Sequence, residues 1–360
     1  MSSKPHLATT AHIRVAFIGS AGIPNRYGGF ESFLEHCAPE IAKHTRAVVV
    51  TCDHSLYEDQ TANFRGVRRI FIPIRANGAH SIMHDLLAFL RVLPIVDQII
   101  VLGVSGGVWF PLFRALCTLM GKRLLVNIDG VEWRRSKFSP WRRGVLRAFD
   151  MLAQVFSHSI IYDNPALAEF VLKGCRKKAS CIAYSGDHIL RRPEVQQQKG
   201  TALTICRIEP ENNIQMVIEG ALASELERYT IVGNWTNSAY GRELHERYSG
   251  EPRLTLLNPV YDPQVLAALR EACGTYIHGH SVGGTNPSLV EMLFYDSRLL
   301  CFECSFNRYT ADTSAEYFGS VGELALLLNT SPASTGDSRA ALSARYTQMG
   351  IGAAYVALFN

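Results

Sequence analysis

The sequence predicts an α/β protein made of two doubly wound, Rossmann-like domains that face a central cleft. A chain of 360 residues is long enough for two hydrophobic cores, at ~100–200 residues per domain. Short β-branched runs alternate with longer amphipathic segments, as in parallel sheets covered by helices on both faces. A polar stretch at residues 190–200, LRRPEVQQQKG, interrupts this alternation, which then restarts.

The strands predicted before the interruption read, in order, IRVAFIG, AVVVTCD, VRRIFIP, QIIVLGV, RLLVNID, HSIIYDN and SCIAYSG. Those after it read TALTICRIE, RYTIVGNW, RLTLLNP, GTYIHGH and RLLCFEC. We therefore assign residues 1–190 to an N-terminal domain and 200–345 to a C-terminal domain, with 346–360 as a helix that can pack back on the N-terminal domain. Ligands of this fold class bind at the carboxyl ends of the strands.

Composition excludes several classes of protein. The net charge of +4 is too small to indicate nucleic-acid binding, and 47% hydrophobic with 19% charged residues excludes a disordered chain. Nine cysteines, an odd number set mostly in apolar runs, indicate reduced thiols. The N-terminus lacks the apolar core of a signal peptide, and glycines and Pro111 break the apolar stretch 101–120 into a strand, a turn and a helix. The expected location is the cytoplasm.

Two glycine-rich turns follow predicted strands of the N-terminal domain. Gly28 and Gly29 lie where the strand-turn segment GSAGIPNRYGG becomes a helix, so their backbone can approach an anionic ligand closely. A turn that only needs glycine for its conformation is the equally weighted alternative. For Gly106 and Gly107, in VLGVSGGVWF, we favour a purely structural role.

The segment TYIHGHSVGGTNPSLVEML carries the most information. Its strand ends near His280, Gly283 and Gly284 form a turn, and Asn286 can cap a helix that starts at Pro287. A phosphate at that helix start would meet free N–H groups. Glu291, about one turn further, can accept hydrogen bonds from sugar hydroxyls; it stands among apolar residues and so needs such a partner or an arginine. A half-exposed helix glutamate and a structural histidine are the alternatives.

Arg207 follows the first strand of the C-terminal domain, in TICRIEPENN, at the carboxyl end of the predicted sheet. A guanidinium there could clamp a diphosphate and stabilise charge on a leaving phosphate. An ion pair with Glu209 or Glu211 is the alternative. In the N-terminal domain Asp129, at the end of RLLVNID, is best placed to orient an acceptor hydroxyl, unless it only caps a turn. No D-x-D motif occurs, so no metal is expected.

The segment 133–147 mixes six basic residues with Trp133, Phe138 and Trp141. Basic and aromatic side chains together suit an anionic membrane surface, whereas a solvated basic face is the ordinary alternative.

Four of these motifs, GIPNRYGGFESF, NIDGVEWRRSKFS, RIEPENN and YIHGHSVGGTNPSLVEM, resemble the bacterial rhamnosyltransferase-like members of glycosyltransferase family 4, which have the GT-B fold. The resemblance covers essentially the whole chain. It implies that Gly28 and Gly29 form a diphosphate loop, that Arg207 binds phosphate, and that Glu291 is the second glutamate of the E-x7-E motif, on the donor ribose. From the local sequence we add His280, Gly283, Gly284, Thr285 and Asn286 to the expected donor-binding residues. Two departures are that Gly283 replaces the first glutamate and that asparagines 212 and 213 stand where a lysine is common.

The resemblance implies a retaining glycosyltransferase that moves a sugar, rhamnose from dTDP-rhamnose, to a saccharide acceptor in bacterial surface polysaccharide synthesis. The acceptor is expected on the N-terminal domain and to be lipid-linked, and the enzyme to rest on the inner face of the cytoplasmic membrane through residues 133–147. No cofactor beyond the donor and no nucleic acid is expected. A GT-B nucleotide-sugar epimerase and a non-catalytic nucleotide-sugar-binding protein are the alternatives.

Overall fold

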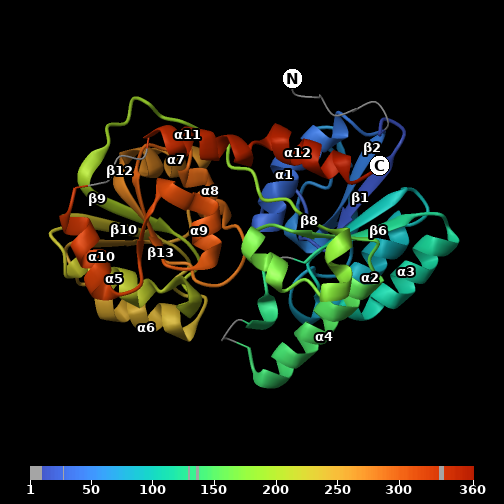
Figure 1. The fold of residues 1–360 in the computed structure, drawn as a ribbon, viewed down its shortest axis with the longest axis horizontal. Helices are drawn as coiled ribbons and strands as arrows, with labels where there is room; N and C mark the ends of the chain where they lie inside the picture. The colour runs from blue at the N-terminus through green and yellow to red at the C-terminus, as the bar shows by residue number, and fades with distance from the viewer. Residues whose placement is uncertain (1–9, 27, 129, 135–137, 332–335) are drawn as a thin grey trace. The chain divides into compact units, whose positions relative to one another are not determined.

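The computed structural model describes residues 10–26, 28–128, 130–134, 138–331 and 336–360. The chain forms two compact units, residues 1–185 with 347–360 (unit 1) and residues 186–346 (unit 2). Figure 1 shows the chain from blue at its N-terminus to red at its C-terminus. Each unit is built around a sheet of mainly parallel strands, as the alternating sequence pattern predicts.

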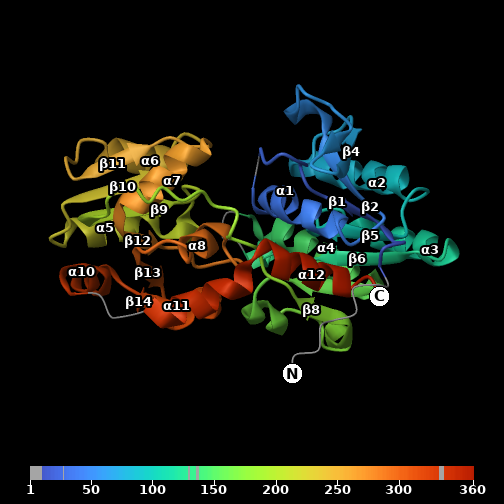
Figure 2. The same cartoon turned by 90° about the horizontal axis from the view of Figure 1, so that it is seen from above.

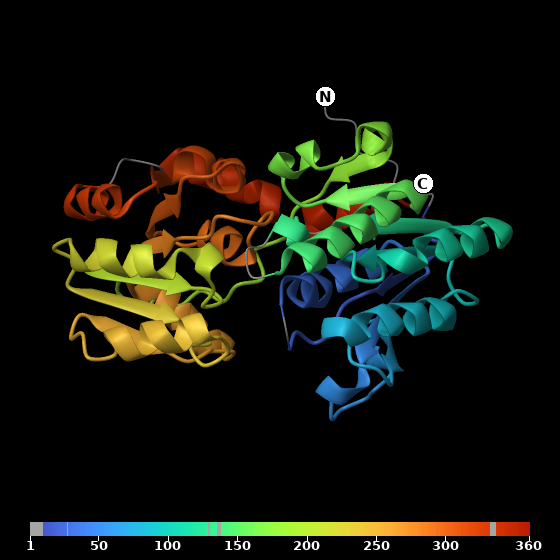
Figure 3. The same ribbon diagram turned by 90° about the horizontal axis from the view of Figure 1, so that it is seen from below.

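Unit 1 contains an eight-stranded sheet in the order β3-β4-β2-β1-β5-β6-β7-β8. Only the pairing of β3 with β4 is antiparallel. The strands are β1 (Arg14–Ile18), β2 (Ala47–Asp53), β3 (Asn63–Phe64), β4 (Val67–Ile72), β5 (Gln98–Leu102), β6 (Arg123–Asn127), β7 (Ser159–Tyr162) and β8 (Ala179–Cys181). The helices are α1 (Gly29–Ala42), α2 (Ser81–Val92), α3 (Phe110–Leu119), α4 (Pro140–Phe156) and α12 (Gln348–Ala357). Figure 3 shows α4 in green as the longest of these helices.

Two hydrophobic clusters account for the core of unit 1. Side chains alternate in direction along a strand, so Val15 and Phe17 of β1 belong to one cluster, and Ala16 and Ile18 to the other. Continuous burial on both faces explains why the strands read as unbroken apolar runs.

The last helix, α12, packs against α1 within unit 1. The rings of Phe33 and Tyr355 have their centroids 4.9 Å apart. The Tyr355 hydroxyl also accepts a hydrogen bond of 3.2 Å from Asn127 at the end of β6. The C-terminal segment thus completes the core of the unit that contains the N-terminal strands.

Unit 2 contains a six-stranded parallel sheet in the order β11-β10-β9-β12-β13-β14. Its strands are β9 (Gln198–Ile205), β10 (Arg228–Val232), β11 (Leu254–Leu257), β12 (Cys273–His278), β13 (Arg298–Phe302) and β14 (Glu316–Phe318). Its helices are α5 (Ile214–Leu222), α6 (Ala239–Tyr248), α7 (Pro263–Ala272), α8 (Pro287–Met292), α9 (Ser305–Ala311), α10 (Val321–Asn329) and α11 (Gly336–Ser343). Figure 2 shows α10 and α11 in red beside β13 and β14, and the core includes the fully buried Trp235 and Phe318.

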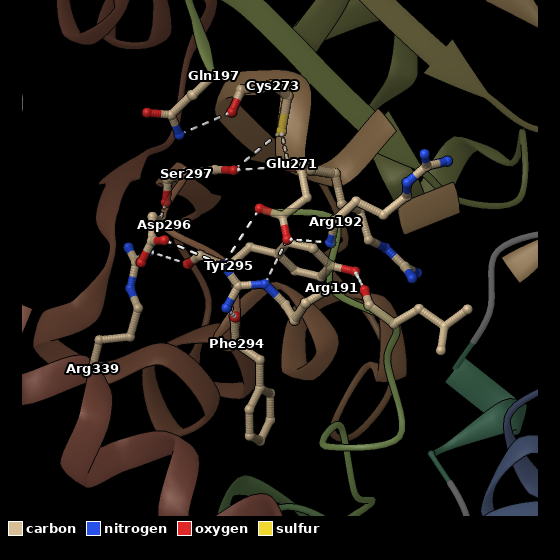
Figure 4. A network of polar contacts seen from close by, with 12 residues as sticks. Arg191, Arg192, Gln197, Glu271, Cys273, Phe294, Tyr295, Asp296, Ser297 and Arg339 are labelled. Carbon is tan, nitrogen blue, oxygen red and sulfur yellow. Dashed lines mark hydrogen bonds and ion pairs between the residues drawn. The ribbon is translucent and has the colours of Figure 1, made fainter. Parts of the chain in front are cut away.

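The polar stretch 190–200 lies in unit 2 and is anchored there. Arg191 pairs with Glu271 at 2.6 Å and with Asp296 at 3.3 Å, and it donates to the Phe294 carbonyl at 2.8 Å (Figure 4). The Tyr295 hydroxyl donates to the carbonyl of Leu190. A charged segment that reads as a linker is therefore held by specific ion pairs.

Candidate functional site

The strand order reverses once in each sheet. In unit 1 the reversal lies between β1 and β5, and in unit 2 between β9 and β12. Proteins with doubly wound sheets bind ligands outside the carboxyl ends of the strands at such a switch point. The loops that follow these four strands are therefore the candidate ligand-binding loops.

In unit 1 the loop after β1 leads into α1. Gly28 is the N-cap residue of α1, and Gly29 is its first residue. The loop bends sharply at Gly22, whose φ of +108° suits glycine; a side chain there would lie 2.5 Å from the sulfur of Cys52. The Glu31 carboxylate accepts a hydrogen bond of 2.6 Å from the Ala21 N–H, which ties the loop to the first turn of α1.

Side chains from β4 and the β2–β3 connection hold the same loop. The guanidinium of Arg69, which is 4% exposed, donates to the Ile23 carbonyl at 3.2 Å. The Tyr57 hydroxyl donates to the Pro24 carbonyl at 2.9 Å. These contacts hold residues 21–24, the part of the loop that follows β1.

The second glycine-rich turn of unit 1 has the structural role expected from its sequence. A side chain on Gly106 would lie 2.7 Å from the carboxylate of Asp85, and one on Gly107 would lie 2.4 Å from the backbone of Phe149. Asp85 is 1% exposed, and burial raises the pKa of its carboxyl group despite hydrogen bonds from His84 and Ser105. Close packing therefore explains both glycines.

Asp129 lies outside the described residues, as do Arg135 and Lys137 of the segment 133–147. Its neighbour Gly130 lines a cavity of about 10 Å³ together with Trp133 and Asp150. The indole N–H of Trp133 donates to the Asp150 carboxylate at 3.2 Å, and burial raises the pKa of that carboxyl group. Trp133 also packs edge-on against Phe170. One of the two tryptophans predicted to meet a membrane is thus turned into the protein.

In unit 2, Arg207 lies two residues beyond β9, and its side chain is exposed. Its carbonyl accepts a hydrogen bond of 2.6 Å from the Asn212 side chain, which fixes the backbone. The guanidinium forms no ion pair with any residue that the structure describes, so the alternative pairing with Glu209 or Glu211 does not occur.

The loop after β9 is joined directly to the end of β12. The Asn212 side-chain oxygen lies 2.5 Å from Nδ1 of His280, which is 9% exposed. Asn213 donates to the Gly279 carbonyl at 2.8 Å, and the Ser281 N–H donates to the carbonyl of Glu211 at 2.9 Å. Arg207 and His280, 73 residues apart in sequence, therefore belong to one hydrogen-bonded pair of loops at the switch point.

The turn between β12 and α8 has the glycine turn and the cap that its sequence predicts, but the prediction of free N–H groups at the helix start is wrong. Pro287 has no N–H, and those of Ser288, Leu289 and Val290 all donate to Asn286. Gly283 has a φ of +144°, and a side chain on it would lie 2.8 Å from the imidazole of His280. Gly284 is half-buried and Thr285 is buried. The Asn286 side chain accepts a hydrogen bond of 3.0 Å from the Ser288 N–H, and Pro287 opens the helix, so the predicted cap is confirmed.

Glu291 is not a half-exposed helix residue, because it is 9% exposed and ion-paired. Its Oε2 accepts a hydrogen bond from Arg270 of α7, and its Oε1 lies 3.2 Å from Nε2 of His188. Burial lowers the pKa of Arg270, but the charge of Glu291 together with Tyr295 and Tyr276 raises it by more, so the net shift is upward. Sequence reasoning anticipated an arginine partner for Glu291 but did not identify Arg270 or His188.

Other features lie apart from these residues. A cavity of about 350 Å³ in unit 1 is lined by Tyr162, Ala168, Glu169, Val171, Arg176 and Ala179, none of which was a predicted site residue. Among the described residues, no cluster of three or more His, Cys, Asp or Glu could hold a metal ion. No helix in the same part of the chain is long and apolar enough to cross a membrane.

Comparisons with known proteins agree with this architecture. The family model described as "Domain of unknown function (DUF1972)" matches residues 12–187. No curated protein matches the chain.

Solved structures do match. Anabaena Alr3699/HepE in complex with UDP and glucose is 16% identical with a TM-score of 0.70, covering 97% of this chain and 99% of that one. Sucrose-phosphate synthase from Thermosynechococcus elongatus is 14% identical with a TM-score of 0.72, covering 97% and 95%. The lipopolysaccharide outer core galactosyltransferase WaaB is 12% identical with a TM-score of 0.61, covering 96% and 99%. The chain has the GT-B glycosyltransferase fold.

Proposed function

We propose that this chain is a retaining glycosyltransferase that binds a nucleotide diphosphate sugar on unit 2 and transfers the sugar to a saccharide acceptor. The observation that carries the proposal is the exposed guanidinium of Arg207, which has no ion-pair partner among the described residues and follows β9 at the switch point. Arginine binds phosphate oxygens through two parallel hydrogen bonds, so this position suits the donor's diphosphate.

The neighbouring turn offers what a diphosphate and its nucleoside need. Gly283 and Gly284 allow a ligand to approach the backbone of this turn closely. As the sugar leaves, negative charge builds on the diphosphate, and Arg207 would stabilise it. Glu291 would accept hydrogen bonds from the ribose, and His280 would contact the sugar or phosphate.

We further propose dTDP-rhamnose as the donor and a bacterial surface polysaccharide as the product. The four sequence motifs that resemble rhamnosyltransferases support the sugar. The UDP and glucose of the HepE complex support a nucleotide-linked sugar as the ligand class. In unit 1 we propose that Gly28 and Gly29 contact the diphosphate and that Asp129 orients the acceptor hydroxyl.

Thermal shift with a panel of nucleotide diphosphate sugars tests the donor. A ligand present at 100 times its Kd adds about 2.7 kcal/mol to the unfolding free energy of the protein that binds it. We expect dTDP-rhamnose to raise the melting temperature most, and the effect to be weaker in Arg207→Ala. Equal and negligible shifts with every member of the panel would refute the proposal.

We also propose that α4 holds the enzyme on the inner, anionic face of the cytoplasmic membrane, where a lipid-linked acceptor would be met. Trp141 is 79% exposed at the start of this helix, beside Arg142 and Arg143. Exposed basic side chains add an attraction to anionic lipid that salt weakens, and an exposed indole adds insertion that salt does not weaken. Because Trp133 packs inward, Trp141 is the residue to test.

Sedimentation with anionic and neutral liposomes at two salt concentrations measures this attachment. We expect binding to anionic vesicles at low salt, less at high salt, and a further loss in Trp141→Ala. Tyr261→Ala is the matched control, because Tyr261 is also 79% exposed but lies in unit 2. Equal, near-zero sedimentation of the unmodified protein with both kinds of vesicle would end this proposal.

A further inference from the structure

We propose that Arg270 is a positioning residue that fixes the carboxylate of Glu291 for the ribose of a nucleoside diphosphate. The inference rests on the proposed function and adds to it a residue that makes no ligand contact of its own. It is drawn from the buried ion pair between α7 and α8.

The ion pair is built into the unit from both sides. Arg270 is 8% exposed, and its carbonyl accepts hydrogen bonds of 3.3 Å from both Cys273 and Ser297, so its backbone is fixed as well as its side chain. Glu291 is 9% exposed and sits between Val290 and Met292, which are fully buried. Neither charged group can move without disturbing packed neighbours.

The two carboxylate oxygens of Glu291 have different partners. Arg270 donates to Oε2, and His188 contacts Oε1 at 3.2 Å. Two contacts on two oxygens define the plane of the carboxylate. Each carboxylate oxygen carries two lone pairs, so an oxygen bonded to a side chain still accepts from a ligand hydroxyl. The pair therefore presents an acceptor of fixed direction one helical turn beyond Asn286.

The partners on either side are tied to each other. Glu271, the residue after Arg270, pairs with Arg191, three residues after His188 (Figure 4). The segment 188–191 is thus held to α7 by one ion pair and to α8 by another contact. Both side chains that fix Glu291 rest on this same framework.

Stability alone is a weak reason for such a pair. The desolvation cost of burying two charges offsets most of their attraction, so a buried ion pair adds little net stability compared with apolar side chains of similar volume. The pair instead fixes the orientation of the Glu291 carboxylate, which matters if that carboxylate binds a ligand. This distinction makes the inference testable separately from folding.

The test compares two ligands by isothermal titration calorimetry on the full chain. One is thymidine or uridine diphosphate, whichever binds the unmodified protein more tightly, and the other is inorganic pyrophosphate, which lacks a ribose. We expect Arg270→Gln to weaken nucleoside diphosphate binding by about ten- to a hundred-fold, the range of a lost charge-assisted hydrogen bond, and to change pyrophosphate binding less than about two-fold. Arg270→Lys, which keeps the charge, should recover part of the loss.

Two further variants control for structure. Arg298 pairs with Glu316 at 2.7 Å with side chains 10% and 22% exposed, so Arg298→Gln breaks a comparable pair elsewhere in unit 2 and should alter neither affinity. The double variant Arg270→Gln with Glu291→Gln removes both charges, so it should fold even if Arg270→Gln alone does not. Its affinity should equal that of Glu291→Gln alone, because Arg270 acts only through Glu291.

The possible results separate the two proposals. If the unmodified protein binds no nucleoside diphosphate, the proposed function fails and this inference fails with it. If the unmodified protein binds but Arg270→Gln binds equally well, or loses both ligands in equal measure, only the positioning role is overturned. A double variant that binds more weakly than Glu291→Gln alone would also overturn it.

Discussion

Arg207 and Glu291 have opposite surroundings, and this determines what each can contribute. Arg207 is exposed and carries a charge that no described residue neutralises, so it is available to an anion. Glu291 is buried and already neutralised by Arg270, so it suits neutral hydroxyl groups that need a fixed acceptor. Charge stabilisation and recognition are thus assigned to different residues of the same unit.

We expect Arg207→Ala to lower turnover by two to three orders of magnitude, about 2.7–4 kcal/mol, as the loss of one preorganised charge-stabilising donor does. Steady-state kinetics with the selected donor measure the effect. Arg228→Ala is the matched control, because Arg228 is also exposed but starts β10, at the opposite end of the sheet. Unchanged kinetics in a folded Arg207→Ala protein would mean that the site is on other residues.

His278 makes a prediction about pH and stability. Burial, with the charge of His280 second, holds the pKa of His278 well below its ordinary value of 6.5, and its Nε2 has no hydrogen-bond partner in the described part of the chain. Above pH 6.5 the imidazole is neutral in both the folded and the unfolded chain, so its titration does not change the free energy of unfolding. As the pH falls below 6.5, His278 is protonated in the unfolded chain but not in the folded chain. The free energy of unfolding therefore falls, by about 1.4 kcal/mol at pH 5.5.

Chemical denaturation at pH 7.5 and 5.5 measures this contribution. His278→Phe keeps a flat ring beside Tyr276 and has no proton to gain, so it should lose about 1 kcal/mol less unfolding free energy between the two pH values than the unmodified protein. The change in unfolding free energy between the two pH values is compared between the two proteins, so the contributions of the other histidines cancel. Equal losses in both proteins would contradict the burial argument.

At the scale of elements, substitutions at two glycines of unit 1 have opposite expected effects on stability. A side chain on Gly107 would lie 2.4 Å from the backbone of Phe149, whereas one on Gly144, inside α4, would meet nothing within 4 Å. Gly107→Ala should therefore lower the free energy of unfolding by about 3 kcal/mol, the upper end of the usual range for overpacking, because the backbone of Phe149 must shift. Gly144→Ala should add about 1 kcal/mol to stability, as glycine is a poor helix former.

Denaturant unfolding of the two variants checks this pair of predictions. A Gly107→Ala protein as stable as the unmodified one would show that the turn after β5 is looser than the structure indicates. A destabilised Gly144→Ala protein would mean that this face of α4 is covered in solution.

The sequence was sufficient for the long buried strands but not for the short ones. β2, a run of seven residues from Ala47 to Asp53, matches the predicted strand AVVVTCD because it opens with four consecutive apolar residues and is followed by polar ones. β3 and β14, with two and three residues, were missed because so few residues show no periodicity. Their pairing depends on the neighbouring strands β4 and β13, which is tertiary information.

The same limit applied to the site. The Asn286 cap and the Gly283 turn could be read locally, because each depends on residues within a few positions. Arg270 and His188 reach Glu291 from 21 and 103 residues away, so no local pattern identifies them. The sequence indicates only that Glu291, which stands among apolar residues, needs a hydrogen-bonding or charged partner; it does not indicate which residue that is.

At the scale of the whole molecule, the fold restricts the function less than the site does. The GT-B fold is shared with HepE, sucrose-phosphate synthase and WaaB at 12–16% identity, and the descriptions of these proteins refer to different sugars. A fold therefore does not decide which sugar is moved, or whether it is moved at all. The chain's own residues at the β9–β12 switch point have to decide that.

Proton NMR of dTDP-rhamnose incubated with the protein, without acceptor and with EDTA present, tests the central claim most directly. We expect slow release of the nucleoside diphosphate and of the free sugar, no effect of EDTA, and loss of the reaction in Arg207→Ala. An isomerised nucleotide sugar would instead identify an epimerase. A donor that binds but remains intact would identify a non-catalytic binding protein.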